Sequence, residues 1–101
     1  MMKGAVFYFT QVQKERADEK FEKILSGYDM LGIKCVKFIK LKEQMSAYFE
    51  NGDCWKLLLP RENTRADRIN IAYVPREPDP NMLMLIQART TCLPYNGIIY
   101  Y

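Results

Sequence analysis

The strongest constraint on the fold lies near the start of the chain, where a short apolar run gives way to a long amphipathic repeat. Gly4–Thr10 is apolar, rich in aromatic residues and too short for a helix, which is typical of a strand buried on both faces in the middle of an α/β sheet. Thr10 and Gln13 have the spacing of a capping box, so a helix should begin at this point. Apolar residues then recur at helical spacing: Ala17, Phe21, Ile24, Leu25, Tyr28 and Leu31. These features predict an amphipathic helix over Thr10–Leu31 that ends at Gly32.

The middle of the chain predicts a strand followed by a hairpin. Residues 33–41 mix β-branched residues with lysine, which indicates a half-buried strand. Asn51-Gly52 accepts the positive φ angles of a tight turn, and strand-forming residues flank it on both sides. A turn centred on this dipeptide predicts three facing pairs: Phe49 with Cys54, Tyr48 with Trp55, and Glu50 with Asp53. The second arm should continue from Trp55 to Leu59, where Pro60 ends it.

The C-terminal part of the chain predicts shorter elements. Residues 61–68 are polar and indicate a loop, and residues 69–74 indicate a buried strand that ends at a proline. Asp79-Pro80 suits a helix start, with Asp as the N-cap and Pro at the first helical position. Residues 82–89 would then form a short helix, although a strand is the alternative that composition leaves open. Residues 98–101 indicate a final strand.

Alternating strands and helices at this spacing predict one α/β domain over residues 1–101. We expect a mixed sheet of about five or six strands with one long amphipathic helix and one short helix. The predicted core is Phe7, Phe9, Phe21, Ile24, Leu25, Trp55, Leu57, Ile71 and Tyr73. No apolar run approaches the roughly 18 residues of a membrane helix, and the first residues lack the features of a secretory signal. The expected location is therefore the cytoplasm.

Residue types that carry chemistry are scarce. The chain has no histidine, and its three cysteines, Cys35, Cys54 and Cys92, are far apart without a C-x-x-C pair. Reduced, structural thiols are the expectation, since zinc would need a fourth ligand. Neither Ser26 nor Ser46 has the sequence context of a nucleophile. We therefore expect a protein that is not an enzyme and binds neither a metal nor a cofactor.

Two segments suggest a family. The turn Phe49-Glu-Asn-Gly52 is followed by Arg65-Ala-Asp-Arg-Ile-Asn-Ile-Ala-Tyr-Val-Pro75, and both lie within the predicted order of strands and helix. This arrangement, over most of the chain, resembles the P-loop-type ATPase core of the large terminase subunits that package phage DNA. In that likeness the first segment matches an aromatic-x-Asn-Gly hairpin. The second matches an Arg-Gly segment and the Walker B strand.

The chain departs from that family where catalysis occurs. It contains no G-x-x-x-x-G-K-[ST] loop, Ala66 stands in place of the glycine, and Pro75 and Arg76 stand in place of the Walker B acid. The resemblance thus implies a stand-alone, phage-encoded fragment of such a core that neither binds nor hydrolyses nucleoside triphosphates. Small phage proteins without catalytic residues commonly act by occupying a host or phage protein in the host cytoplasm. Inhibitors of bacterial defence systems, such as anti-CRISPR proteins, work in this way.

Two functional hypotheses follow. In the first, the protein binds a protein partner through the adaptable apolar and aromatic side chains Met82, Met84 and Tyr95. In the alternative, a basic face binds nucleic acid through Lys34, Lys37, Lys40, Lys42, Arg61, Arg65, Arg68 and Arg76. A formal net charge of +3 is small for a dedicated nucleic-acid-binding domain and favours the first. One continuous basic stripe would favour nucleic acid, and a lysine-flanked apolar patch would favour a protein.

Overall fold

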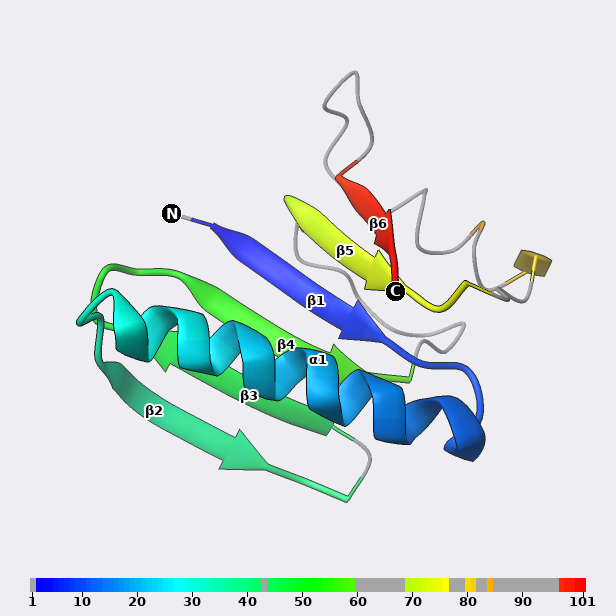
Figure 1. Cartoon of the computed structure of the whole chain (residues 1–101), viewed down its shortest axis with the longest axis horizontal. Coiled ribbons are helices and arrows are strands. Elements are labelled where there is room, and N and C mark those ends of the chain that lie inside the picture. The colour runs from blue at the N-terminus through cyan, green and yellow to red at the C-terminus, as the bar shows by residue number, and fades with distance from the viewer. Residues whose placement is uncertain (1, 43, 60–68, 77–79, 82–83, 85–96) are drawn as a thin grey trace.

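The computed structural model of the chain describes residues 2–42, 44–59, 69–76, 80–81, 84 and 97–101, and these residues form a mixed sheet with a helix on one face (Figure 1). Strand β1 (Lys3–Phe7) lies between β4 (Cys54–Leu58) and β5 (Ile71–Val74) and runs parallel to both. Its residues after Lys3 are buried, because both faces of a central strand are covered. The prediction of a strand buried on both faces is confirmed.

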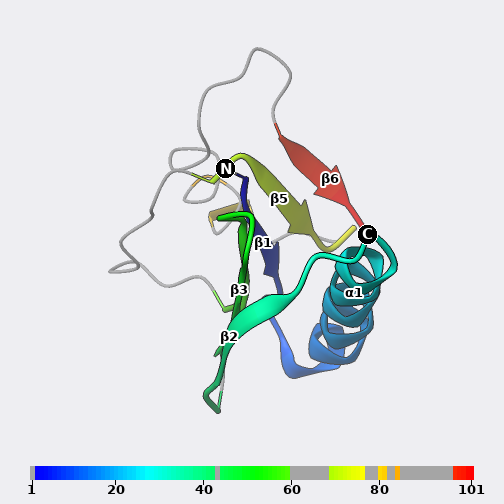
Figure 2. The same cartoon turned by 90° about the vertical axis from the view of Figure 1, so that its left-hand side faces the viewer.

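The sheet has six strands in the order β2-β3-β4-β1-β5-β6. Strands β2 (Cys35–Lys40), β3 (Gln44–Phe49) and β4 form an antiparallel meander at one side, and β6 (Ile98–Tyr100) runs parallel to β5 at the other side. Helix α1 (Gln11–Met30) leads from the end of β1 to the start of β2 and lies on one face of the sheet, as the turned view shows (Figure 2). The predicted α/β class with a mixed sheet and one long helix is confirmed.

The ends of α1 are set by local chemistry close to the predicted residues. Thr10 is the N-cap, and its hydroxyl accepts a hydrogen bond from the N–H of Gln13 (3.3 Å). The Gln13 amide oxygen reaches one residue further back than in a capping box and accepts the N–H of Phe9 (2.9 Å). At the other end Gly32 has a φ of 74°, and Ile33 N–H donates to the carbonyl of Tyr28. This Schellman arrangement confirms Gly32 as the terminator.

The hairpin lies where Asn51-Gly52 predicts it, but its register differs from the prediction. Tyr48 is paired with Cys54 rather than with Trp55, and Phe49 N–H donates to the carbonyl of Asp53 (2.9 Å). The cause is a longer turn, because Gly52 has a φ of 93° and its N–H donates back to the carbonyl of Phe49. A type I turn that ends in a left-handed glycine adds one residue to the loop and shifts every pair. The predicted pairs of Phe49 with Cys54, Tyr48 with Trp55 and Glu50 with Asp53 are therefore wrong.

Two apolar clusters lie on the two faces of the sheet. The cluster under α1 contains Val6, Tyr8, Ala17, Phe21, Ala47, Phe49, Trp55 and Leu57. The cluster on the opposite face contains Ala5, Phe7, Ala72 and Val74. All nine predicted core residues are buried in one of these clusters or packed against it. Gly4 lies directly against the indole of Trp55, and a Cβ atom at this position would overlap the ring.

The peripheral segments show where sequence patterns are weaker. The strand predicted as half-buried over residues 33–41 is β2, which is exposed at every position except Ile39, because it is the outermost strand. Pro80, Asn81 and Met84 are helical, which agrees with a helix that starts near Pro80. The rest of residues 82–89, the N-cap Asp79 and the loop predicted over 61–68 lie outside the described residues.

Candidate functional site

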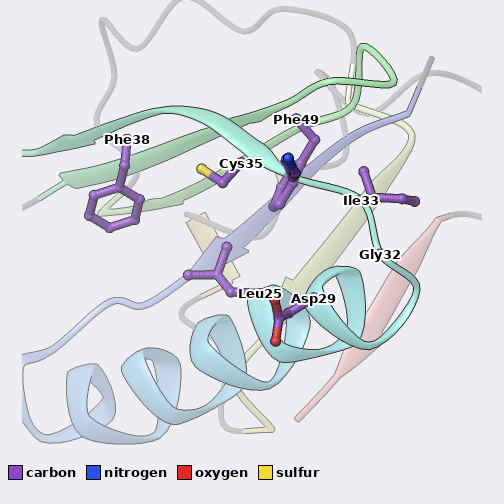
Figure 3. A pocket seen from close by; sticks show the side chains of 8 residues that line it. Leu25, Asp29, Gly32, Ile33, Cys35, Phe38 and Phe49 are labelled. Carbon is purple, nitrogen blue, oxygen red and sulfur yellow. The ribbon is translucent and has the colours of Figure 1, made fainter.

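A groove with a volume of about 680 Å³ lies between the C-terminal half of α1 and strand β2. Phe38 extends from β2 toward the helix, and Leu25 extends from α1 toward the sheet (Figure 3). Phe49 and Ile33 line the groove as well, with Asp29 at the helix side. The groove is thus mainly apolar and has one carboxylate on its wall.

The groove follows from the position of the helix over the sheet. Helix α1 packs over β1 and β4, which lie at the centre, whereas β2 lies two strands beyond β4. A single helix is about 10 Å wide and covers roughly two strands spaced about 4.8 Å apart. The helix-side face of β2 is therefore not packed closely against α1, and the groove lies between them.

A partly buried hydrogen-bond chain lies along one side of the groove. The ring of Tyr28 stacks on Phe49, with centroids 3.9 Å apart and planes at 13°. The indole N–H of Trp55 donates to the Tyr28 hydroxyl (2.8 Å), which donates to the Asp53 carboxylate (2.6 Å). The backbone N–H of Met2 also donates to Asp53 (2.8 Å). These contacts join the end of α1, the hairpin and Met2 just before β1, on the side of the groove where Phe49 lies.

The same chain shifts two pKa values in opposite directions. Burial, followed by the hydrogen bond to the Asp53 carboxylate, raises the pKa of Tyr28 from 10.0 to about 12. Burial alone would raise the pKa of Asp53, but hydrogen bonds from Tyr28, Met2 N–H and Asn51 outweigh it and lower that pKa. At neutral pH the pair is therefore a neutral phenol and an ionised carboxylate.

Several large apolar side chains are exposed on the elements that bound the groove. They are Met30 at the end of α1, Leu31 in the connection after it, Val36 and Phe38 of β2, and Leu41 just after β2, and we call them the β2 edge surface. Their exposed fractions run from 47% for Phe38 to 87% for Met30. Isolated apolar side chains are common on protein surfaces, but exposed apolar side chains on the segments that bound an apolar groove make it the candidate interaction site of the described residues.

Four lysines surround this surface but do not form one basic stripe. Lys34 lines the groove, and Lys40 and Lys42 line a second cavity of about 170 Å³ at the other end of β2. Lys37 is on the opposite face of the sheet, where its ammonium lies 5.9 Å from the centroid of the Tyr48 ring. The cavity walls on the helix side carry acids, Asp29 in the first and Asp18 and Glu22 in the second. The basic residues are thus divided between two faces and mixed with acids.

The remaining predicted site residues are not brought to this surface. Arg76 is exposed just after β5, and β1, β4 and β3 separate it from β2. Met84, which is helical, is 67% exposed. Met82, Tyr95, Arg61, Arg65 and Arg68 lie outside the described residues. The structure therefore leaves the predicted partner-binding set untested as a group.

Sequence analysis missed the β2 edge surface, although the chain holds a signal for it. Lysines at positions 34, 37, 40 and 42 alternate with apolar residues, and lysine is a common device for protecting an edge strand. The sequence pattern alone assigns the lysines to a nucleic-acid hypothesis and places Val36 and Phe38, which lie between them, in a half-buried strand. Only the strand order shows that these apolar residues lie at the margin of the sheet.

Other chemistry has little support in the described residues. They contain no cluster of three or more histidine, cysteine or acidic side chains that could hold a metal ion. Neither Cys35, which is exposed, nor Cys54 is part of a disulfide. None of the described helices is both long enough and apolar enough to span a membrane. Comparison of the chain with protein-family models, with curated proteins and with solved structures found no match.

Proposed function

We propose that this protein acts by binding another protein at the β2 edge surface and the groove beside it, without catalysis of its own. The observation that carries the proposal is the apolar groove of about 680 Å³ with exposed apolar side chains on both bounding elements. Apolar side chains in such a position gain free energy when a partner removes them from water, at about 25 cal/mol per Å² of apolar area. Flanking lysines would add charge at the rim of the interface.

The distribution of charge supports a protein partner over nucleic acid. A site that binds along a nucleic-acid backbone needs several cations on one surface without nearby anions, because its affinity comes from neutralising the phosphates. Here Lys37 is on the face opposite Lys40, and Asp18 and Glu22 share a cavity with Lys40. A net charge of +3 adds only a weak overall field.

The class of partner is proposed from the resemblance to large terminases. A phage-encoded fragment of that fold without its nucleotide site would act by occupancy in the host cytoplasm. Its partner would be a host or phage protein, and a component of a defence system, as for anti-CRISPR inhibitors, is one such target. The groove supports this mode of action because occupancy needs an exposed recognition surface and no reacting group.

The test compares two single charge insertions. Phe38→Glu places a carboxylate in the groove, and the matched control Val12→Glu places one on α1 at a side chain that is 85% exposed and lines neither cavity. Tagged proteins are incubated with nuclease-treated extract of the cells that express the chain, and captured proteins are quantified by mass spectrometry. We expect a partner that the unmodified protein and Val12→Glu capture and that Phe38→Glu loses. Equal capture by both variants, or capture of the partner only from extract that has not been treated with nuclease, would contradict the proposal.

A further inference from the structure

The outer edge of β2 has backbone groups that point away from the sheet. Leu41 N–H donates to the carbonyl of Gln44 (2.8 Å), which makes this a hydrogen-bonded pair of the antiparallel β2–β3 ladder. Hydrogen-bonded and non-hydrogen-bonded pairs alternate along such a ladder. Ile39 is therefore bonded to β3, whereas the N–H and C=O groups of Phe38 and Lys40 point outward.

No described strand or helix pairs with that outward edge. Strand β2 is the first strand in the sheet order and lies at the margin of the molecule (Figure 1). A row of outward N–H and C=O groups is a template on which a further strand can pair. The helix-side face of the same strand opens into the groove, so a side chain of an added strand would have apolar space beside Phe38.

The charge around β2 decides which strand could pair there. Between Asp29 and Glu43 the sequence has four lysines and no acid. Among the described residues, neither Lys37 nor Lys40 of β2 forms an ion pair, although Lys40 shares the second cavity with Asp18 and Glu22 of α1. A second copy of this chain would bring its own lysines into the strand pair with no acid between them, which is unfavourable.

We infer that β2 binds an extended segment of the partner protein as an added strand, and that this segment carries acidic side chains opposite Lys37 and Lys40. The inference rests on the proposed function and specifies its binding mode. Side chains opposite Phe38 and Ile39 are apolar, and the one opposite Phe38 enters the groove. The recognised pattern is acidic–apolar–apolar–acidic, with main-chain hydrogen bonds at Phe38 and Lys40 supplying the affinity.

The first experiment uses the unmodified protein and a capped synthetic peptide, Thr-Glu-Val-Val-Glu-Thr, as the probe. Amide hydrogen exchange is followed by NMR with and without peptide. The amides of Phe38 and Lys40 should become protected by about tenfold or more, because they gain hydrogen bonds only on strand addition. A peptide with Lys in place of both Glu residues should bind about tenfold more weakly. Chemical-shift changes without amide protection, or equal binding of the two peptides, would overturn the inference.

The second experiment separates charge from backbone pairing at one position. Lys40→Gln removes the charge and keeps the outward N–H, whereas Lys40→Pro removes both and leaves the bonds to β3 in place. Peptide affinity should fall about two- to fivefold in the first variant and about fivefold further in the second. Equal losses would overturn strand addition. If circular dichroism shows that Lys40→Pro does not fold, the measurement of amide protection in the unmodified protein tests strand addition instead.

The outcomes also separate this inference from the proposed function. A partner captured in a Phe38-dependent manner without protection of the Lys40 amide would keep the proposed function and refute strand addition. Tight, salt-sensitive binding of a single-stranded oligonucleotide to the same lysines, in preference to the acidic peptide, would refute both.

Discussion

Removal of one hydroxyl group tests whether the hydrogen-bond chain beside the groove stabilises the fold. Tyr28→Phe keeps the stacking on Phe49 but deletes both the acceptor of the Trp55 indole N–H and the donor to Asp53. A hydrogen bond to a charged group contributes about 1.5–3 kcal/mol, and a buried N–H left without an acceptor costs about 1–3 kcal/mol. Because one hydroxyl serves both bonds and Tyr28 and Asp53 are partly exposed, we expect a loss of about 2 kcal/mol in the free energy of unfolding.

The loss should depend on pH, because the lowered pKa of Asp53 is a contribution to stability. A carboxylate with a folded pKa below its ordinary value of 3.8 stabilises the fold above that pH, and the contribution disappears as the pH falls through the folded pKa. The hydrogen bond from Tyr28 is the largest of the interactions that lower this pKa. The difference in the free energy of unfolding between the unmodified protein and Tyr28→Phe should therefore have its largest value at pH 7 and decrease below about pH 4.

Urea unfolding followed by the fluorescence of Trp55, the one tryptophan of the chain, measures the difference. With a slope of about 1–3 kcal/mol per molar urea, the midpoint should move down by about 1 M. Tyr100→Phe is the matched control, since Tyr100 is 49% exposed and its hydroxyl has no hydrogen bond within the described residues. A loss below about 0.5 kcal/mol for Tyr28→Phe, or an equal loss for the control, would refute the argument.

Three further predictions use the same urea assay. Gly27→Ala should raise the free energy of unfolding by about 0.5–1 kcal/mol, because Gly27 is inside α1 and nothing lies within 4 Å of an added Cβ; a neutral or negative change would contradict this. Gly4→Ala should lower it by about 1–3 kcal/mol, because the Cβ would overlap the indole of Trp55; an unchanged midpoint would show that the ring can move aside. Stability should also fall above pH 10, because burial raises the pKa of Tyr28 and of Tyr101 to about 12, so the folded state keeps protons that the unfolded state releases. A flat profile between pH 10 and 12 would refute the last prediction.

Elements with local signals were predictable from the sequence. The apolar run of β1 and the capping residues of α1 act over a few residues, so pattern and chemistry agree without knowledge of the rest of the fold. Thr10 and Gly32 mark the helix ends to within one or two residues. The position of the hairpin was predictable for the same reason, because Gly52 adopts the positive φ that Asn-Gly favours.

The hairpin register was not predictable in this way, because contacts distant in sequence select it. Glu50 N–H donates to the carbonyl of Lys34 (2.9 Å), and the Glu50 carboxylate accepts the N–H of Lys34 (3.1 Å). Asp53 is held by Tyr28 of the helix (2.6 Å). These bonds accompany the longer turn, in which Glu50 lies in the loop and Phe49, rather than Glu50, is opposite Asp53.

The candidate site depended on strand order, which no local pattern contains. Val36 and Phe38 alternate with lysines in a way that suits a half-buried strand as well as an edge strand. Their exposure follows from the place of β2 at the end of the sheet and from a helix that covers β1 and β4 instead. The lysines were therefore predictable as candidate binding residues, whereas the apolar surface between them was not.

In strand addition at β2, the lysines would attract a strand that carries acidic side chains and repel a strand that carries lysines. An opposite-charge cross-strand pair contributes about 0.2–1 kcal/mol, and a like-charge pair costs a similar amount. With Lys37 and Lys40 both engaged, an acidic segment is favoured over a lysine-bearing one, such as a second β2, by about 1–4 kcal/mol. The main-chain hydrogen bonds are the same for either strand, so they supply affinity without choosing between them. On this proposal the lysines keep an exposed apolar edge from pairing with itself and select the acidic segment that can pair with it.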